Sequence, residues 1–140
     1  MASKKKVFIT DCEGPISKND NAFELASHYI PQGDKLFKKL SRYDDVLADI
    51  VRKPGYRAGN TLCLILPFLK AYGVSNGVMY SFSRKTLTLM KDSMESLSFL
   101  KNMLPSYIVS TSYEHYILSL IHISEPTRPR LISYAVFCLK

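Results

Sequence analysis

The sequence contains little cysteine and no tryptophan, and the shortage of cysteine excludes two classes of small protein. Its 140 residues include three cysteines, Cys12, Cys63 and Cys138. Three cysteines at these separations form neither a disulfide framework nor the closely spaced pairs of a zinc site. We therefore expect a chain that folds around a hydrophobic core in a reducing compartment, and we predict a cytoplasmic location.

Long apolar runs and an extended basic stripe are also missing. No segment approaches the about 20 apolar residues that cross a bilayer, and the apolar run after Lys6 ends at Asp11, too soon for a signal peptide. The net charge is +7, but the lysines are spread over faces that we expect to be solvated. A nucleic-acid site needs a clustered basic patch with base-reading groups. We expect neither membrane insertion nor nucleic-acid binding.

The most informative segment that is present covers residues 7–15, VFITDCEGP. A short β-branched apolar run predicts a buried strand, and Gly14-Pro15 ends it with a turn. Asp11 and Glu13 then lie at the carboxyl end of this strand, which is the edge where open α/β sheets bind ligands. Two carboxylates at such an edge can hold a cation, attack an electrophile or share acid and base roles.

The rest of the chain contains mainly helical signals, followed by a second β-favouring run at residues 107–109. One of the expected helices takes Asp44 or Asp45 as its N-cap. Strands separated by helices predict an α/β fold with a parallel sheet, here an incomplete one with two strands. We divide the chain into a first strand with its loop, a long helical insert that covers the strand ends, and a helix with the second strand: residues 1–17, 18–90 and 91–117.

The second predicted strand ends in hydroxyl residues, Ser110 and Thr111. If it lies parallel to the first strand, Asp11 and Ser110 meet at one edge of the sheet. A carboxylate nucleophile opposite a hydroxyl donor suits a phosphoryl group, since the carboxylate attacks phosphorus and the hydroxyl binds a non-bridging oxygen. Mg²⁺ would offset the repulsion between the two anions, and Glu13 would protonate the leaving oxygen and then activate water. We expect the substrate to be a small phosphorylated metabolite.

These residues resemble the motifs of the haloacid dehalogenase (HAD) superfamily. Its first motif is an apolar strand that ends in Asp-x-Asp, which residues 7–13 resemble, and its second is a strand that ends in Ser or Thr, which residues 107–110 resemble. The resemblance implies a Rossmann-like fold with a helical cap inserted between the two strands. It implies Asp11 as the nucleophile, Ser110 at the phosphate, and Mg²⁺ bound by the Asp11 carboxylate and by the backbone carbonyl of Glu13.

A longer likeness extends over most of the chain before residue 118. Four segments are similar to HAD-like proteins of the energy-converting hydrogenase A subunit R type: residues 11–31, 41–56, 64–74 and 107–117. However, Glu13 stands where the superfamily has Asp, and the superfamily's Lys and acidic-pair motifs would lie farther along. The alternative is therefore a non-catalytic accessory or regulatory protein of a hydrogenase complex. We expect this chain by itself to be inactive and prone to aggregation.

Residues 118–140 resemble the in-frame translation of a sequencing-library adapter. Residues 118–128 resemble one part of such an adapter, residues 132–139 resemble its outer part, and residues 129–131 occupy the place of a sample index. We therefore exclude residues 118–140 from the fold prediction, as one excludes a fusion remnant. The native sequence would then break off near Ile117.

Several other polar residues have simpler interpretations than a place in an active site. We expect the following at helix ends, helix surfaces or loops, with substrate contact as the alternative: His28, Asp44, Asp45, Tyr56 and Arg57.

Overall fold

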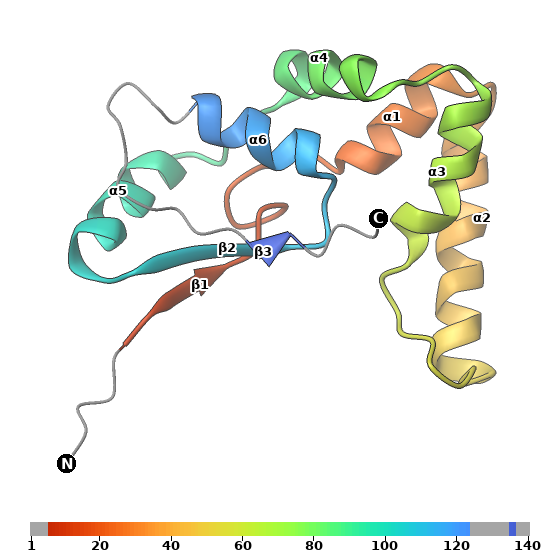
Figure 1. Ribbon diagram of the computed structural model, residues 1–140, viewed down its shortest axis with the longest axis horizontal. Helices are drawn as coiled ribbons and strands as arrows, with labels where there is room; N and C mark the ends of the chain where they lie inside the picture. The colour runs from red at the N-terminus through yellow and green to blue at the C-terminus, as the bar shows by residue number, and fades with distance from the viewer. Residues whose placement is uncertain (1–5, 124–134, 137–140) are drawn as a thin grey trace.

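The computed structural model describes residues 6–123 and 135–136, and this part of the chain has an α/β fold (Figure 1). The predicted α/β class is confirmed. In chain order the elements are β1 (Phe8–Thr10), α1 (Asn21–Tyr29), α2 (Gly33–Asp45), a π-helical turn η1 (Val46–Ile50), α3 (Thr61–Ala71), α4 (Asn76–Thr86), α5 (Ser93–Met103), β2 (Ser106–Ser110), α6 (Glu114–Ile123) and β3 (Ala135–Val136).

The two predicted strands, β1 and β2, form a parallel pair. Thr10 of β1 is level with Ile108 of β2, so both strands end at the same edge. A third strand was not predicted: β3 extends the sheet in the order β1-β2-β3. It pairs Ala135 with Val109, and it falls within the segment that we excluded as adapter-like. The sheet is therefore larger than predicted by one short strand.

Helices α5 and α6 lie on the same side of the sheet (Figure 1). Ile108 packs there with Tyr116, Ile117 and Leu120 of α6, which together form one hydrophobic cluster with the loop after β1. On the opposite face, the described residues leave Ile9 60% exposed and Val109 39% exposed. The prediction of a buried first strand is therefore wrong for this face.

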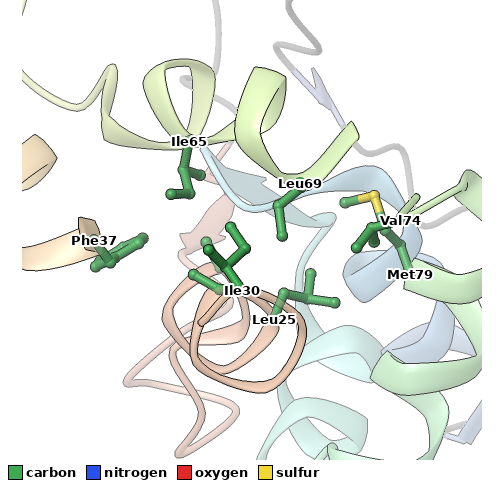
Figure 2. Packing of buried hydrophobic residues seen from close by; sticks show 9 residues of the cluster. Leu25, Ile30, Phe37, Ile65, Leu69, Val74 and Met79 are labelled. Atoms are coloured by element: carbon green, nitrogen blue, oxygen red, sulfur yellow. The ribbon is translucent and has the colours of Figure 1, made fainter. Parts of the chain in front are cut away.

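The helical insert has a hydrophobic core of its own (Figure 2). Leu25 of α1 and Ile30 just after it face Ile65 and Leu69 of α3, and Phe37 of α2 lies on one side. These residues recur at helical spacing, which gives each helix an apolar face toward its neighbours. The insert therefore packs around a hydrophobic cluster separate from that of the sheet.

The two connections between the insert and the sheet lie side by side. The Lys18 N–H donates to the Thr88 carbonyl at 2.9 Å. The side chain of Asn19 joins the same segments, since it donates to the Thr86 carbonyl at 3.1 Å and accepts from the Thr88 N–H at 2.6 Å. The chain thus leaves and re-enters the sheet region at one place, close to the loop that follows β1.

The helix expected to start at Asp44 or Asp45 does not exist as a separate element. Helix α2 runs without a break through both residues and continues as the π-helical turn η1. No glycine or proline interrupts residues 34–53, so nothing in the backbone ends the first helix before the second apolar group begins. The N-cap prediction for these two residues is therefore wrong.

Helix α6 crosses the boundary at which we set the adapter-like segment apart. Ser119 and Leu120 lie beyond that boundary, within α6, and both are buried. Of the remainder of the segment, residues 124–134 and 137–140 lie outside the described residues.

Candidate functional site

Asp11 follows directly after β1 and is exposed at the carboxyl edge of the sheet. The chain turns back immediately after it, because the N–H groups of Ile16 and Ser17 both donate to the Cys12 carbonyl at 3.1 Å. Gly14 has a φ of +94°, which a residue with a side chain rarely adopts. The Cys12 N–H donates to Oδ1 of Asp11 at 2.6 Å and fixes the direction of the carboxylate.

Glu13 belongs to this loop, and its side chain contacts the start of the insert. Its Oε1 accepts the N–H of Asn21, the first residue of α1, at 3.0 Å. Burial raises the pKa of Glu13, and the nearby charges of Asp20 and Asp11 act in the same direction. Hydrogen bonds from the Asn21 N–H and from the Ser112 hydroxyl oppose this effect without cancelling it. Glu13 therefore binds a proton more readily than an exposed glutamate does.

Ser110 ends β2, and its hydroxyl is held by Ser112. The Ser110 hydroxyl donates to Oγ of Ser112 at 3.1 Å, and the Ser112 N–H donates back to Oγ of Ser110 at 3.2 Å. Ser110 and Ser112 are buried, at 6% and 4% exposure, whereas Thr111 between them is exposed. Ser112 was not predicted as a site residue, although it follows Ser110 and Thr111 directly in the sequence.

The structure thus brings Asp11, Glu13 and Ser110 to one edge of the sheet. Glu13 is electrostatically coupled to Asp11, whose charge contributes to its raised pKa. Thr111 lies at the same edge but faces solvent. The arrangement offers an exposed carboxylate, a second carboxylate with a raised pKa, and hydroxyl groups at the end of a neighbouring strand.

The chain is similar to a solved structure, gene product AF1437 from Archaeoglobus fulgidus. The two share 32% sequence identity with a TM-score of 0.80 over 98% of this chain, and they share the α/β fold. The match covers 44% of AF1437, so this chain spans less than half of that protein's length. No family profile matches this chain, and no curated protein matches it.

The donor set at the strand ends fits a small divalent cation. Within the described residues, no three side chains of His, Cys, Asp or Glu are grouped as a metal site. Mg²⁺ needs fewer protein ligands, because it retains waters and is usually bound by one or two carboxylates together with substrate phosphate. Asp11 supplies an exposed carboxylate with one oxygen not used by Cys12. The charges of Asp11, Glu13 and Asp20 also lie close enough to interact, and a cation would reduce this repulsion.

Cys12 does not add a reactive thiol to this edge. Burial, together with the charges of Glu13 and Asp11, raises the pKa of the thiol to about 12. The thiolate is the nucleophilic form, and at neutral pH it is scarcely populated at such a pKa. Cys12 instead packs in the hydrophobic cluster of the sheet.

Asp44 has a structural role that the sequence did not indicate. It is 2% exposed, and its carboxylate accepts from the Tyr56 hydroxyl at 2.7 Å, the Gly59 N–H at 3.0 Å, and both the N–H and hydroxyl of Thr61 at 3.0 and 2.9 Å. Burial alone would raise its pKa, but the hydrogen bonds prevail and lower it. The expectation of a solvated helix end is therefore wrong for Asp44, and Tyr56 belongs to the same structural cluster. Asp45 is exposed.

A groove of about 1300 Å³ lies between α1 and α4, away from the strand ends. His28 is exposed in this groove, and its ring lies 5.2 Å from that of Phe82. Among the described residues, those that line the groove do not include Asp11, Glu13 or Ser110. This groove is therefore separate from the residues at the strand ends.

In the part of the chain that the structure describes, no single helix is both long and apolar enough to cross a lipid bilayer. Helices α3 and α4 reach that length only as a pair, and the pair is bent by 114°.

Proposed function

We propose that this chain carries the nucleophile and phosphate-binding motifs of a HAD-like, Mg²⁺-dependent phosphohydrolase. One observation supports this most strongly: an exposed carboxylate, Asp11, ends one parallel strand beside a strand that ends in Ser110. The carboxyl edge of such a sheet is where α/β proteins bind ligands. The substrate would be a small phosphorylated metabolite, and the protein would act in the cytoplasm.

Each side chain of the group has a step in the proposed reaction. An oxygen of Asp11 attacks phosphorus and the bond to the leaving oxygen breaks, which gives an aspartyl-phosphate. Glu13 gives its proton to that leaving oxygen. Glu13 then takes a proton from water as the water hydrolyses the aspartyl-phosphate, and Asp11 and inorganic phosphate are released. The raised pKa of Glu13 supports this role, since an acid that retains its proton nearer to neutral pH is a better donor there.

Ser110 and Thr111 would bind the non-bridging oxygens of the phosphoryl group. When bound, Mg²⁺ would be held by the Asp11 carboxylate and by the backbone carbonyl of Glu13, and it would offset the repulsion between Asp11 and the substrate. AF1437 extends well beyond the part that this chain matches. The proposed activity therefore belongs to a protein that contains further segments, and this chain alone is expected to be inactive.

One observation favours a second candidate, a non-catalytic HAD-like accessory protein of an energy-converting hydrogenase. The Glu13 carboxylate already accepts from the Asn21 N–H at the start of α1. A carboxylate held in this way anchors a helix, and its side chain is one methylene longer than the Asp of the superfamily. A displacement of about 1 Å can lower a reaction rate about 100-fold. In this candidate function the site would retain its fold and lose its turnover.

A phosphatase assay separates the two functions. We would express the longer protein in which residues 6–117 continue into native sequence in place of the adapter-like segment, and measure its hydrolysis of p-nitrophenyl phosphate with Mg²⁺. Asp11→Asn should lower kcat by at least about 10³-fold, and Glu13→Gln by about 10²-fold or more. Asp49→Asn is the matched control, because Asp49 is exposed on η1 of the insert. Activity unchanged in Asp11→Asn would exclude Asp11 as the nucleophile, and no activity in the wild-type protein would favour the accessory function.

A further inference from the structure

The groove between α1 and α4 brings two opposite charges to one end. Among the described residues that line it, Glu24 of α1 is the acidic side chain and Lys85 of α4 is the lysine. The side-chain amide of Asn19 connects the two helices at this end. It donates to Oε1 of Glu24 at 2.7 Å and to the carbonyl of Thr86, the residue after Lys85, at 3.1 Å. The groove therefore presents a carboxylate and an ammonium group close to each other.

Glu24 has one carboxylate oxygen that is not used within the fold. Asn19 donates to Oε1, whereas Oε2 is buried and has no hydrogen-bond partner among the described residues. A buried charged acceptor without a donor is costly. The terminal torsion of glutamate is soft and Glu24 is partly exposed, so the carboxylate can present its unused oxygen to a molecule in the groove. A protonated amine supplies the missing donor and also matches the charge.

An aromatic surface lies one helical turn from these charges. His28 follows Glu24 by four residues on α1, and Phe82 precedes Lys85 by three residues on α4. Residues at these spacings share a helix face and lie one turn, about 5.4 Å, apart along the axis. The rings of His28 and Phe82 are 5.2 Å apart and both line the groove. The groove thus places an aromatic surface beside a pair of opposite charges.

We propose that this groove binds a free α-amino acid with an aromatic side chain. Its ammonium group donates to Glu24, its carboxylate accepts from Lys85, and its ring packs against His28 and Phe82. Two carbon atoms separate the ring from the amine nitrogen in such an amino acid, a span comparable to one helical turn. The proposal does not depend on the proposed function, because none of the groove residues belongs to the site at the strand ends.

Three ligands that differ only in charge test the proposal with the chain as it exists. We would measure the Kd of L-phenylalanine, phenethylamine and 3-phenylpropionate by equilibrium dialysis. Phenethylamine lacks the carboxylate and 3-phenylpropionate lacks the ammonium group. Each should bind about tenfold or more weakly than phenylalanine, the effect of losing one charge-assisted hydrogen bond.

Two variants should change these affinities in a crossed pattern. Glu24→Gln, which can still accept from Asn19, should weaken phenylalanine and phenethylamine about tenfold or more and leave 3-phenylpropionate unchanged. Lys85→Met keeps an apolar stem and should weaken phenylalanine and 3-phenylpropionate, but not phenethylamine. Glu95→Gln and Lys70→Met are the matched controls, because both residues are exposed and lie outside the groove, and neither should change any Kd.

The ring contact is tested by His28→Ala, which removes an exposed side chain. It should weaken all three ligands by a similar factor of about three or more. Binding of all three that is unchanged in His28→Ala would contradict the assigned position of the ring.

Several results would overturn the proposal. One is the absence of saturable phenylalanine binding. Another is phenethylamine binding as tightly as phenylalanine, since the groove would then be a site for simple cations. N-acetylphenylalaninamide carries the ring without either charge, as in a peptide, and equal binding of this compound would indicate an apolar docking groove for a protein segment. If Glu24→Gln does not fold, Lys85→Met, which changes an exposed side chain, still decides through its contrast between the two analogues.

Discussion

Glu13 is a residue whose surroundings favour its neutral form. Burial contributes most to its raised pKa, followed by the charges of Asp20 and Asp11. A raised pKa in the folded state adds stability below the unfolded value of about 4.3, and this stability is lost as the pH rises through the folded value. We therefore expect Glu13→Gln to increase the free energy of unfolding at pH 7 by up to about 1 kcal/mol, since the amide oxygen can still accept from Asn21.

Urea unfolding at pH 7 and at pH 4 checks this prediction. The difference between Glu13→Gln and the wild-type protein should shrink at pH 4, where wild-type Glu13 is itself protonated. A variant that is less stable than the wild type at pH 7 would show that the charged carboxylate stabilises the first turn of α1 more than burial disfavours it.

At the scale of a single element, the carboxylate of Asp44 holds the start of α3, and its substitution is expected to lower the free energy of unfolding. Its carboxylate accepts four hydrogen bonds, two of them from Thr61, the first residue of α3. Asp44→Asn replaces an acceptor oxygen by an NH₂ group that faces those donors, and we expect a loss of about 2–3 kcal/mol in the free energy of unfolding. Because the pKa of Asp44 is lowered, its stabilisation is present above about pH 3.9, the unfolded value, and is lost as the pH falls through the folded value.

Denaturant unfolding between pH 2.5 and pH 7 measures this effect, with Asp45→Asn as the matched control. Asp45 is the next residue of α2 and is exposed, so its substitution should change stability by less than about 0.5 kcal/mol. Equal losses in the two variants would mean that the hydrogen bonds of Asp44 add nothing beyond a surface charge.

At this scale the sequence predicted what local chemistry determines. The side chain of Asp20 accepts from the Phe23 N–H and caps α1, a local contact of the kind that capping preferences describe. The Ser110 strand and the parallel pairing also follow from the pattern of apolar residues. The hydrogen bonds from the start of α3 to Asp44 could not be predicted, because they depend on how distant segments meet. Asp44 and Thr61 are 17 positions apart, and no spacing rule connects them.

At the scale of the whole molecule, the open face of the sheet is the main feature. Parallel sheets are normally covered on both faces, yet Ile9 of β1 is 60% exposed here and Val109 of β2 is 39% exposed. The two-sided cover expected of such a fold is incomplete within the residues described. We predict that this chain self-associates through the open face, and that Ile9→Lys shifts it toward the monomer by placing a charge there.

Light scattering coupled to size exclusion measures the mass in solution for each variant. Ile50→Lys is the control, because Ile50 is 75% exposed and lies in η1 of the insert, outside the sheet. Ile9→Lys should lower the average mass, and Ile50→Lys should leave it unchanged. A monomeric wild-type chain, or an equal effect of both substitutions, would argue against the sheet as the surface through which the chain self-associates.

Phosphorylation of Asp11 is the central step of the proposed reaction. Borohydride reduces an acyl phosphate on aspartate to homoserine, so the longer protein can be mixed with a phosphate ester and Mg²⁺, treated with borohydride during turnover, digested and sequenced by mass spectrometry. We predict homoserine at position 11, and only when the ester is present. Turnover of the ester with residue 11 recovered entirely as aspartate would contradict the account.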